Sequence, residues 1–180
     1  MKLDGKTAIV TGAASGFGAG IARKFAAEGA TVMIVDLNED AAQGIASDIG
    51  GTAYKADVSN GDEVADMIET AITRMGHVDI IVNNAGITHL PAQMEDVTED
   101  DFDRVFAVNC KSVYLTARSL VPHFKHRQTG AILNIASTAG VSPRPRLNWY
   151  NASKGWMITA TRAMAVELAP EGIRVNALNP

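Results

Sequence analysis

The chain has 180 residues, the size of a single domain, and 47% of them are hydrophobic, which is enough to bury a core. Its net charge is −4 and its isoelectric point is near 5.5, so no basic surface argues for a nucleic-acid partner. One cysteine excludes an intrachain disulfide, and there is neither a secretory leader nor an apolar run of about 18 residues. We therefore expect a cytoplasmic protein that binds neither nucleic acid nor membrane.

Short apolar segments alternate with amphipathic ones along the chain. They predict strands at residues 6–11, 31–36, 52–56, 78–82, 130–136 and 173–177. Helices are expected at 17–28, 39–49, 61–75, 99–127 (broken near Asn109) and 149–169. The segments Ser59–Asp62 and Thr98–Asp101 have the spacing of capping boxes. Strands joined by helical crossovers predict an α/β fold, a doubly wound parallel sheet in three layers and one domain.

A glycine-rich turn joins the first expected strand to the first expected helix. Gly12, Gly16 and Gly18 have the spacing G-x-x-x-G-x-G, which differs from the standard G-x-G-x-x-G. In such a turn the first glycine permits the tight bend, the second lets the backbone approach a phosphate, and the third allows close packing of helix on strand. The segment predicts a pyrophosphate site at a helix N-terminus, the alternative being a turn that only connects two elements.

The second expected strand ends at Asp36, eighteen residues after Gly18. An acid about 20 residues past the glycines is typical of a carboxylate that accepts hydrogen bonds from an adenosine ribose. The carboxylate repels a 2′-phosphate, and the uncharged Ser15 and Leu37 cannot neutralise one, which favours NAD over NADP. The alternative is that Asp36 merely caps the helix that starts near Asn38.

Tyr150 and Lys154 lie four residues apart on an expected helix, and Ser137 is thirteen positions before Tyr150. The four-residue spacing puts both side chains on one helix face. A lysine ammonium favours the phenolate, which allows a tyrosine to exchange a proton near neutral pH. Beside a nicotinamide, these residues and a serine hydroxyl predict hydride transfer to or from a carbonyl.

Together these motifs resemble the short-chain dehydrogenase/reductase family of the standard soluble type, from Leu3 to Pro180. The family's marks are T-G-x-x-x-G-x-G at Thr11–Gly18, N-N-A-G at Asn83–Gly86, Y-x-x-x-K at Tyr150–Lys154, and single residues at Asn109 and Ser137. The resemblance implies a Rossmann-type fold, with residues 1–180 as one NAD-binding catalytic domain. It also implies an NAD-dependent oxidoreductase that interconverts a secondary alcohol and a ketone.

The resemblance further implies a role for each site residue. Tyr150 is the general acid/base, Ser137 binds the substrate oxygen, and Lys154 holds the nicotinamide ribose. Asn109 marks a helix kink whose free carbonyl holds a water leading to Lys154. The residues expected to contact the cofactor are Gly12, Ser15, Gly16, Phe17, Gly18, Asp36, Leu37, Asp57, Val58, Asn84, Ala85, Gly86, Tyr150 and Lys154.

No metal site is expected, because the four histidines lack ligand spacing with one another, with cysteine or with acids. The substrate is not determined: a sugar or polyol dehydrogenase and a 3-oxoacyl thioester reductase both fit the sequence. A protein of another class, a non-catalytic NAD-binding sensor or scaffold, is a further alternative. Arg144, Arg146, Trp149 and His89 are either walls of the substrate pocket or ordinary loop and core residues.

Two expectations concern the rest of the molecule. In relatives the sequence continues beyond the position of Pro180, so the C-terminal part of the family fold is expected to be missing from this chain. The helices near residues 110–124 and 150–168 carry apolar residues on more than one face. They predict a homotetramer or a homodimer.

Overall fold

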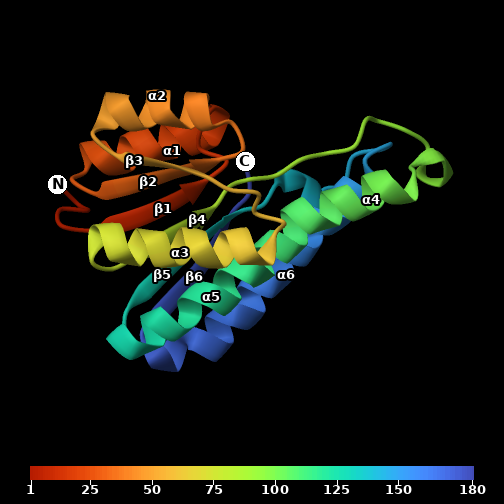
Figure 1. Cartoon of the computed structure of the whole chain (residues 1–180). Coiled ribbons are helices and arrows are strands. Elements are labelled where there is room, and N and C mark those ends of the chain that lie inside the picture. The colour runs from red at the N-terminus through yellow and green to blue at the C-terminus, as the bar shows by residue number, and fades with distance from the viewer.

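A computed structural model describes all residues from Met1 to Pro180. Its centre is a parallel sheet of six strands in the order β3-β2-β1-β4-β5-β6 (Figure 1). The strands are β1 (Thr7–Thr11), β2 (Thr31–Asp36), β3 (Thr52–Lys55), β4 (Ile80–Asn83), β5 (Gly130–Ile135) and β6 (Ile173–Leu178). The order reverses between β1 and β4, so loops leaving these two strands diverge and leave a crevice for a ligand.

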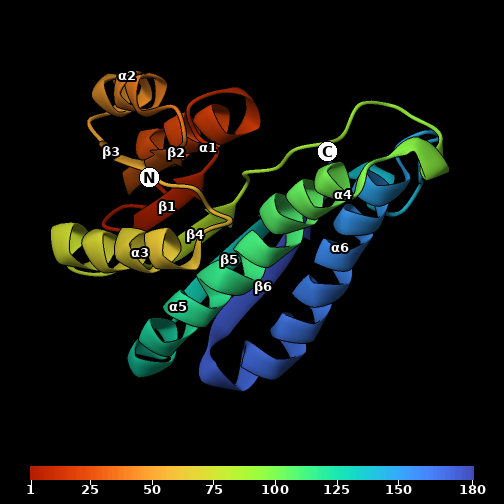
Figure 2. The same cartoon turned by 45° about the vertical axis from the view of Figure 1, so that its right-hand side comes forward.

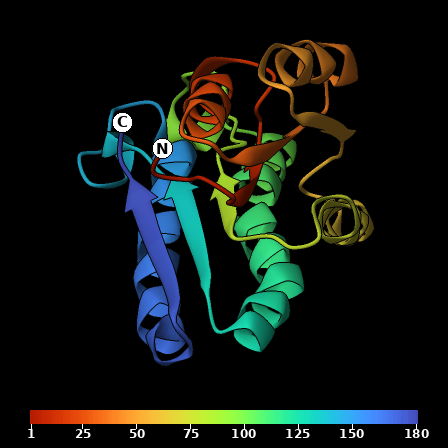
Figure 3. The same cartoon turned by 90° about the vertical axis from the view of Figure 1, so that its left-hand side faces the viewer.

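Helices cover the two faces of the sheet, which makes three layers. Helices α1 (Gly16–Ala27) and α2 (Glu39–Ile49) pack on one face, over β1, β2 and β3. Helices α3 (Gly61–Met75), α5 (Ser112–Arg127) and α6 (Asn148–Leu168) cover the other face (Figures 2 and 3). A short helix, α4 (Glu99–Phe106), precedes α5. The predicted doubly wound α/β fold is confirmed.

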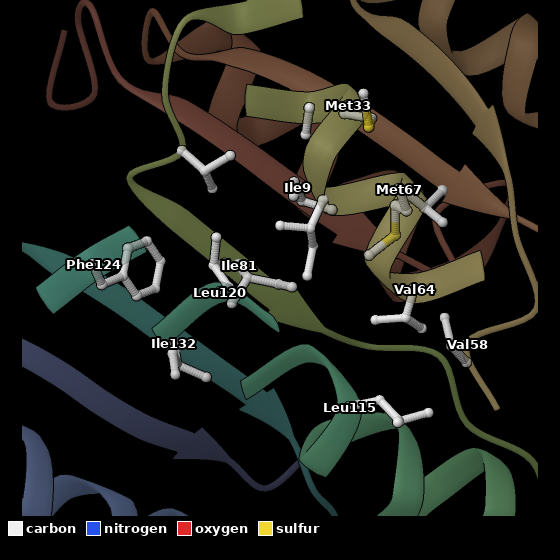
Figure 4. Packing of buried hydrophobic residues seen from close by; sticks show 14 of the residues in the cluster. Ile9, Met33, Val58, Val64, Met67, Ile81, Leu115, Leu120, Phe124 and Ile132 are labelled. Carbon is white, nitrogen blue, oxygen red and sulfur yellow. The ribbon is translucent and has the colours of Figure 1, made fainter. Parts of the chain in front are cut away.

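Alternating side chains of the strands enter two separate cores. Ile9 of β1 belongs to a cluster with Met67 of α3 and Phe124 of α5 (Figure 4). The next residue, Val10, belongs to a cluster on the opposite face with Ala46 of α2. Burial on both faces explains why the strands of this parallel sheet read as continuous apolar runs in the sequence.

Strands and helices end within two residues of their expected positions, and the predicted break near Asn109 is a π-helical turn, η2 (Ala107–Lys111). One capping prediction is wrong. Asn60, not Ser59, caps α3 by accepting hydrogen bonds from the amides of Asp62 and Glu63, and it donates to the Glu63 carboxylate in return. An asparagine accepts from these amides as well as a serine does, so the sequence pattern fits either residue.

A chain of buried polar side chains crosses the sheet from α5 to α6. Thr116 of α5 donates to Asn83 Oδ1 at 3.0 Å, and Asn83 Nδ2 donates to Asn134 Oδ1 at 2.8 Å. Asn134 Nδ2 then donates to Thr161 of α6, also at 2.8 Å. Asn83 and Asn134 are direct partners in the β4–β5 register. These hydrogen bonds join α5 and α6 to β4 and β5 near the carboxyl ends of the two strands.

At the opposite edge of the sheet, Asp79 joins β1, β4 and α5. Its carboxylate is 6% exposed and accepts from the Thr7 amide at 3.0 Å and from Arg127 at 3.1 Å, and it lies 3.1 Å from His77 Nε2. Burial raises the pKa of this carboxyl, but the hydrogen bonds from the Thr7 amide and Arg127, together with the charges of Lys6 and His77, outweigh burial and hold the pKa below its ordinary value.

We expect Asp79→Asn to lower the free energy of unfolding by about 2–3 kcal/mol at pH 7. A carboxyl whose pKa is lower in the folded than in the unfolded chain stabilises the fold above its ordinary pKa, and this contribution is lost as pH falls through the folded value. The difference from wild type should therefore shrink at acid pH. Urea unfolding of the wild type and the variant at pH 7 and pH 3.5 measures this difference in the free energy of unfolding. An equal difference at the two pH values would contradict the charge-based explanation.

Candidate active site

A cavity of about 350 Å³ opens at the carboxyl edge of the sheet, where β1 and β4 diverge. Its walls include ten of the residues expected to bind the cofactor: Gly12, Ser15, Phe17, Asp36, Leu37, Asp57, Val58, Asn84, Ala85 and Gly86. Sequence reasoning missed Val35, Ala56, Ile87 and Val108. The first three directly precede or follow predicted residues, so the strand ends could have indicated them; Val108 lies in the π-helical turn.

The glycine turn has the geometry that a bound pyrophosphate needs. Gly12 has φ +61°, and a Cβ there would lie 2.8 Å from Ala85 Cα. A Cβ on Gly18 would lie 2.9 Å from Ala13 Cα, so only glycine permits this contact of helix and strand. Gly16 has φ +54° and faces open space. Ser15, the N-cap of α1, makes no side-chain capping bond, which leaves its hydroxyl and the first amides of α1 free for an anion.

Asn84 fixes the turn against β4. Its Nδ2 donates to the carbonyls of Thr11 and Gly12, both at 2.9 Å, and the amides of Asn84 and Ala85 donate to the Thr11 hydroxyl at 3.1 Å. The two loops that border the cavity are therefore held together independently of any ligand.

Asp36 braces the same turn from β2. Its Oδ2 accepts from the Ala14 amide at 3.0 Å and its Oδ1 from the Asn38 amide at 3.1 Å. Asn38 itself caps α2 by accepting from Ala41, so the alternative of Asp36 as the helix cap is wrong. Each carboxylate oxygen of Asp36 has capacity for a further hydrogen bond beside the cavity.

A second cavity, of about 460 Å³, adjoins the first. Ser137, Tyr150 and Lys154 line it, and it shares four wall residues with the first cavity: Phe17, Asn84, Gly86 and Ile87. Ser137 Oγ accepts from the Ala139 amide at 3.1 Å, which leaves its hydroxyl proton free to donate. The structure thus brings three of the four predicted catalytic residues to one space beside the predicted cofactor site.

Lys154 reaches this space from inside the protein. It is 4% exposed, its Nζ donates to the Ile135 carbonyl at 2.9 Å, and Nζ lies 5.9 Å from the centre of the Tyr150 ring. Burial lowers the pKa of Lys154 to about 8, because a charged ammonium is poorly solvated there. A Cβ on Gly86 would lie 3.2 Å from Nζ, so glycine at this position gives the ammonium room.

Asn109 lies beneath the site in the π-helical turn and is fully buried. Its Oδ1 accepts from the Ile87 amide, and its Nδ2 donates to the Ile87 carbonyl and to Ser153 Oγ, all at 2.9 Å. Ser153 Oγ donates to the Tyr150 carbonyl at 2.7 Å. The side chain of Asn109 is thus occupied by the protein. Ser153, which sequence reasoning missed, links it to α6.

Of the four residues with an open interpretation, only Arg144 lines the second cavity. Trp149 packs edge-to-face on Phe102, with ring centres 5.3 Å apart. His89 is 1% exposed, and its Nδ1 lies 2.8 Å from the Leu90 carbonyl. Arg146 is exposed, with φ +63°.

No helix is both long and apolar enough to cross a membrane. No three His, Cys, Asp or Glu side chains gather where they could hold a metal ion.

Residues 6–180 match the family model for short chain dehydrogenases. The chain belongs to the short-chain dehydrogenase/reductase family. It is 45% identical over its whole length to 4-formylbenzenesulfonate dehydrogenase TsaC1/TsaC2 of Comamonas testosteroni, of which it covers 73%. It is 36% identical to the 3-oxoacyl-[acyl-carrier-protein] reductase FabG of Thermotoga maritima, again over its whole length and 75% of the relative.

Solved structures of the family agree with the fold. The chain is 49% identical to the 3-ketoacyl-(acyl-carrier-protein) reductase of Brucella melitensis complexed with NADH, with a TM-score of 0.97 over 99% of this chain and 75% of that one. For NAD⁺-bound xylitol dehydrogenase the identity is 32% and the TM-score 0.94, over 100% and 71%. The predictions of a short-chain dehydrogenase, of an oxidoreductase and of NAD(H) as its cofactor are confirmed.

Proposed function

We propose that this family member interconverts a secondary alcohol and a ketone, with Tyr150 as the general acid/base. One observation carries the proposal: Ser137, Tyr150 and Lys154 line a cavity that shares four wall residues with the dinucleotide cavity. A substrate in the second cavity is therefore next to a cofactor in the first, which is the proximity that hydride transfer requires. We place both cavities in one catalytic domain, residues 1–180, and expect the enzyme to act in the cytoplasm.

Each residue has a defined task in this reaction. A nicotinamide held in the first cavity would supply or accept the hydride that the substrate carbon gains or loses. In the oxidative direction Tyr150 takes the hydroxyl proton, and in the reductive direction it returns a proton to the carbonyl oxygen. Ser137 donates a hydrogen bond to that oxygen. Lys154 supplies positive charge beside Tyr150 and a donor for the nicotinamide ribose. Asn109 holds the segment at Ile87 in place and leaves only its backbone to bind a water.

Turnover of a panel of alcohols and ketones, followed by nicotinamide absorbance at several pH values, tests the proposal. We expect reduction of at least one ketone with NADH. Tight NAD binding without turnover of any compound would instead favour the NAD-binding sensor.

A second candidate within the same chemistry is a 3-oxoacyl thioester reductase. The identity of 49% to the Brucella melitensis reductase favours including it. A 3-oxoacyl thioester belongs in the panel for this reason, and a kcat/KM for it far above that of simple ketones would select this candidate.

Cofactor preference provides a direct test of Asp36. We expect Asp36→Ala to lower kcat/KM for NAD and to raise it for NADP, because the carboxylate no longer binds the ribose or repels a 2′-phosphate. Adding Leu37→Arg should supply a phosphate partner and move the preference further toward NADP. Since Asp36 also braces the Ala14 amide, thermal unfolding of each variant is the control. Equal use of both cofactors by the wild type would contradict the assignment.

We further propose that two or four copies associate through α5 and α6. An apolar groove of about 720 Å³ runs between these helices, with Tyr114 and Trp156 partly exposed along it. Light scattering at micromolar concentration should give a dimer or tetramer. Ala163→Glu, which places a charge in the groove, should shift it toward the monomer, whereas Ser47→Glu on α2 should not. A monomeric wild type would contradict the proposal.

A further inference from the structure

The second cavity has an excess of positive charge. Arg144 and Lys154 line it, and no aspartate or glutamate does. The Lys154 ammonium already donates to the Ile135 carbonyl. Arg144, in contrast, takes part in none of the protein's ion pairs. Arg144 is an exposed residue of the cavity wall, and its cation has no protein anion to neutralise it.

The backbone of Arg144 is anchored to the helix that carries Tyr150. Its carbonyl accepts a hydrogen bond of 2.7 Å from Nδ2 of Asn151, a residue 6% exposed. Two residues on, the Arg146 carbonyl accepts from the Ala92 amide at 3.1 Å, which ties the loop to the segment after β4. Pro143 and Pro145 on either side of Arg144 restrict the backbone further. Because the backbone of Arg144 is held in place, the loop loses less entropy when this residue binds a ligand.

The remaining walls suit a carbon skeleton. Ile87, Ile135 and Leu147 line the cavity together with Arg144, Ser137 and Tyr150. A ligand with an oxygen at Ser137 and Tyr150 and a negative group at Arg144 would place its apolar part against these side chains. A guanidinium binds a carboxylate or sulfonate through two parallel hydrogen bonds, which gives orientation as well as affinity.

We propose that the enzyme selects substrates that carry an anionic group, and that Arg144 binds this group while Ser137 and Tyr150 hold the reacting oxygen. The inference rests on the proposed function of Ser137 and Tyr150. It makes Arg144 a residue that determines specificity, and it defines the substrate class as hydroxy or oxo acids.

Matched acids and esters test the proposal by turnover. Acetoacetate is compared with methyl acetoacetate, and 4-acetylbenzoate with its methyl ester, each reduced with NADH. We expect the wild type to favour at least one acid over its ester by tenfold or more in kcat/KM. Arg144→Gln should reduce that ratio by at least tenfold, mainly through KM, and Arg144→Lys should retain part of it. Arg146→Gln, in the same loop but outside the cavity, is the matched control and should leave the ratio unchanged.

Binding provides a second readout that needs no turnover. Calorimetry of acetate and benzoate with the protein–NADH complex should show binding to the wild type that Arg144→Gln weakens about tenfold and Arg146→Gln does not. If no ketone is reduced but this pattern holds, the proposed function fails and the anion site stands. Esters used as well as acids, no binding of either carboxylate, or equal losses in Arg144→Gln and Arg146→Gln would each overturn the proposal.

Discussion

Replacing Tyr150 with phenylalanine should lower kcat by about 10²–10⁴-fold, the range that loss of a general acid/base typically costs. Tyr150 lines the cavity beside Ser137, and no protein group forms a hydrogen bond with its hydroxyl. The substitution therefore leaves no buried group unpaired and should change neither stability nor NADH affinity by much. Stopped-flow reduction of the best ketone measures the chemical step, and quenching of protein fluorescence measures NADH binding.

The matched control is Tyr114→Phe, which also removes a tyrosine hydroxyl, but from a residue of α5 that is 53% exposed. It should leave kcat within a factor of two. A Tyr150→Phe enzyme that keeps most of its activity would show that another group exchanges the proton. A parallel loss of NADH binding would assign Tyr150 to the cofactor rather than to the chemistry.

Replacing Lys154 with methionine should have opposite effects on activity and stability. Burial lowers the pKa of Lys154 from its ordinary 10.5 to about 8, so keeping it charged at pH 7 costs the fold about 3 kcal/mol. Methionine avoids this cost but gives up the hydrogen bond to the Ile135 carbonyl, worth about 1 kcal/mol. The cofactor-free variant should therefore unfold about 4–8 °C higher, while kcat/KM falls by roughly 10²–10³-fold.

The pH dependence separates this explanation from simple repacking. A lysine whose pKa is lower in the folded than in the unfolded chain destabilises the fold fully below the folded pKa. The penalty is relieved as pH rises from about 8 to 10.5, because the unfolded chain then holds more protons. The advantage of Lys154→Met should therefore shrink over that range in calorimetric scans. Lys111→Met, at an exposed position, is the control and should show no such pH dependence. If the stability gained by Lys154→Met did not change with pH, the electrostatic cause would be contradicted.

The fold and most of the cofactor cavity could be predicted because their signals are local in the sequence. The glycine turn, Asp36 and the N-N-A-G segment each follow a strand, and parallel strands bring their carboxyl ends to one edge. The break at Asn109 was expected from the resemblance to the family, because an asparagine in mid-helix is by itself only mildly unfavourable. Its form, a π-helical turn, depends on contacts with Ile87 and Ser153 that lie 22 and 44 residues away.

Other features depend on packing between distant segments and had no local signal. Ser153 is an ordinary small residue in the sequence, and only the approach of α6 to the π-helical turn brings its hydroxyl to Asn109. Arg144 and Arg146 are indistinguishable by pattern, because which of them lines the cavity depends on the backbone of a loop with two prolines. The burial of Lys154, with its cost, likewise appears only when α6 packs against the end of β5.

The buried hydrogen bonds that run from Thr116 through Asn83 and Asn134 to Thr161 divide the protein into a part that cannot shift and a part that can change. If either α5 or α6 moved along the sheet, a buried side-chain amide would lose its hydrogen-bond partner. Each unpaired group would lower the free energy of unfolding by about 1–3 kcal/mol. The positions of α5 and α6, and with them those of Asn109 and Tyr150, are therefore fixed relative to the sheet. The loop bearing Arg144 lies outside that chain. Replacing residues 141–147 should thus change which substrates the enzyme accepts without moving the residues that carry out the reaction. This loop is therefore the natural target for directed evolution.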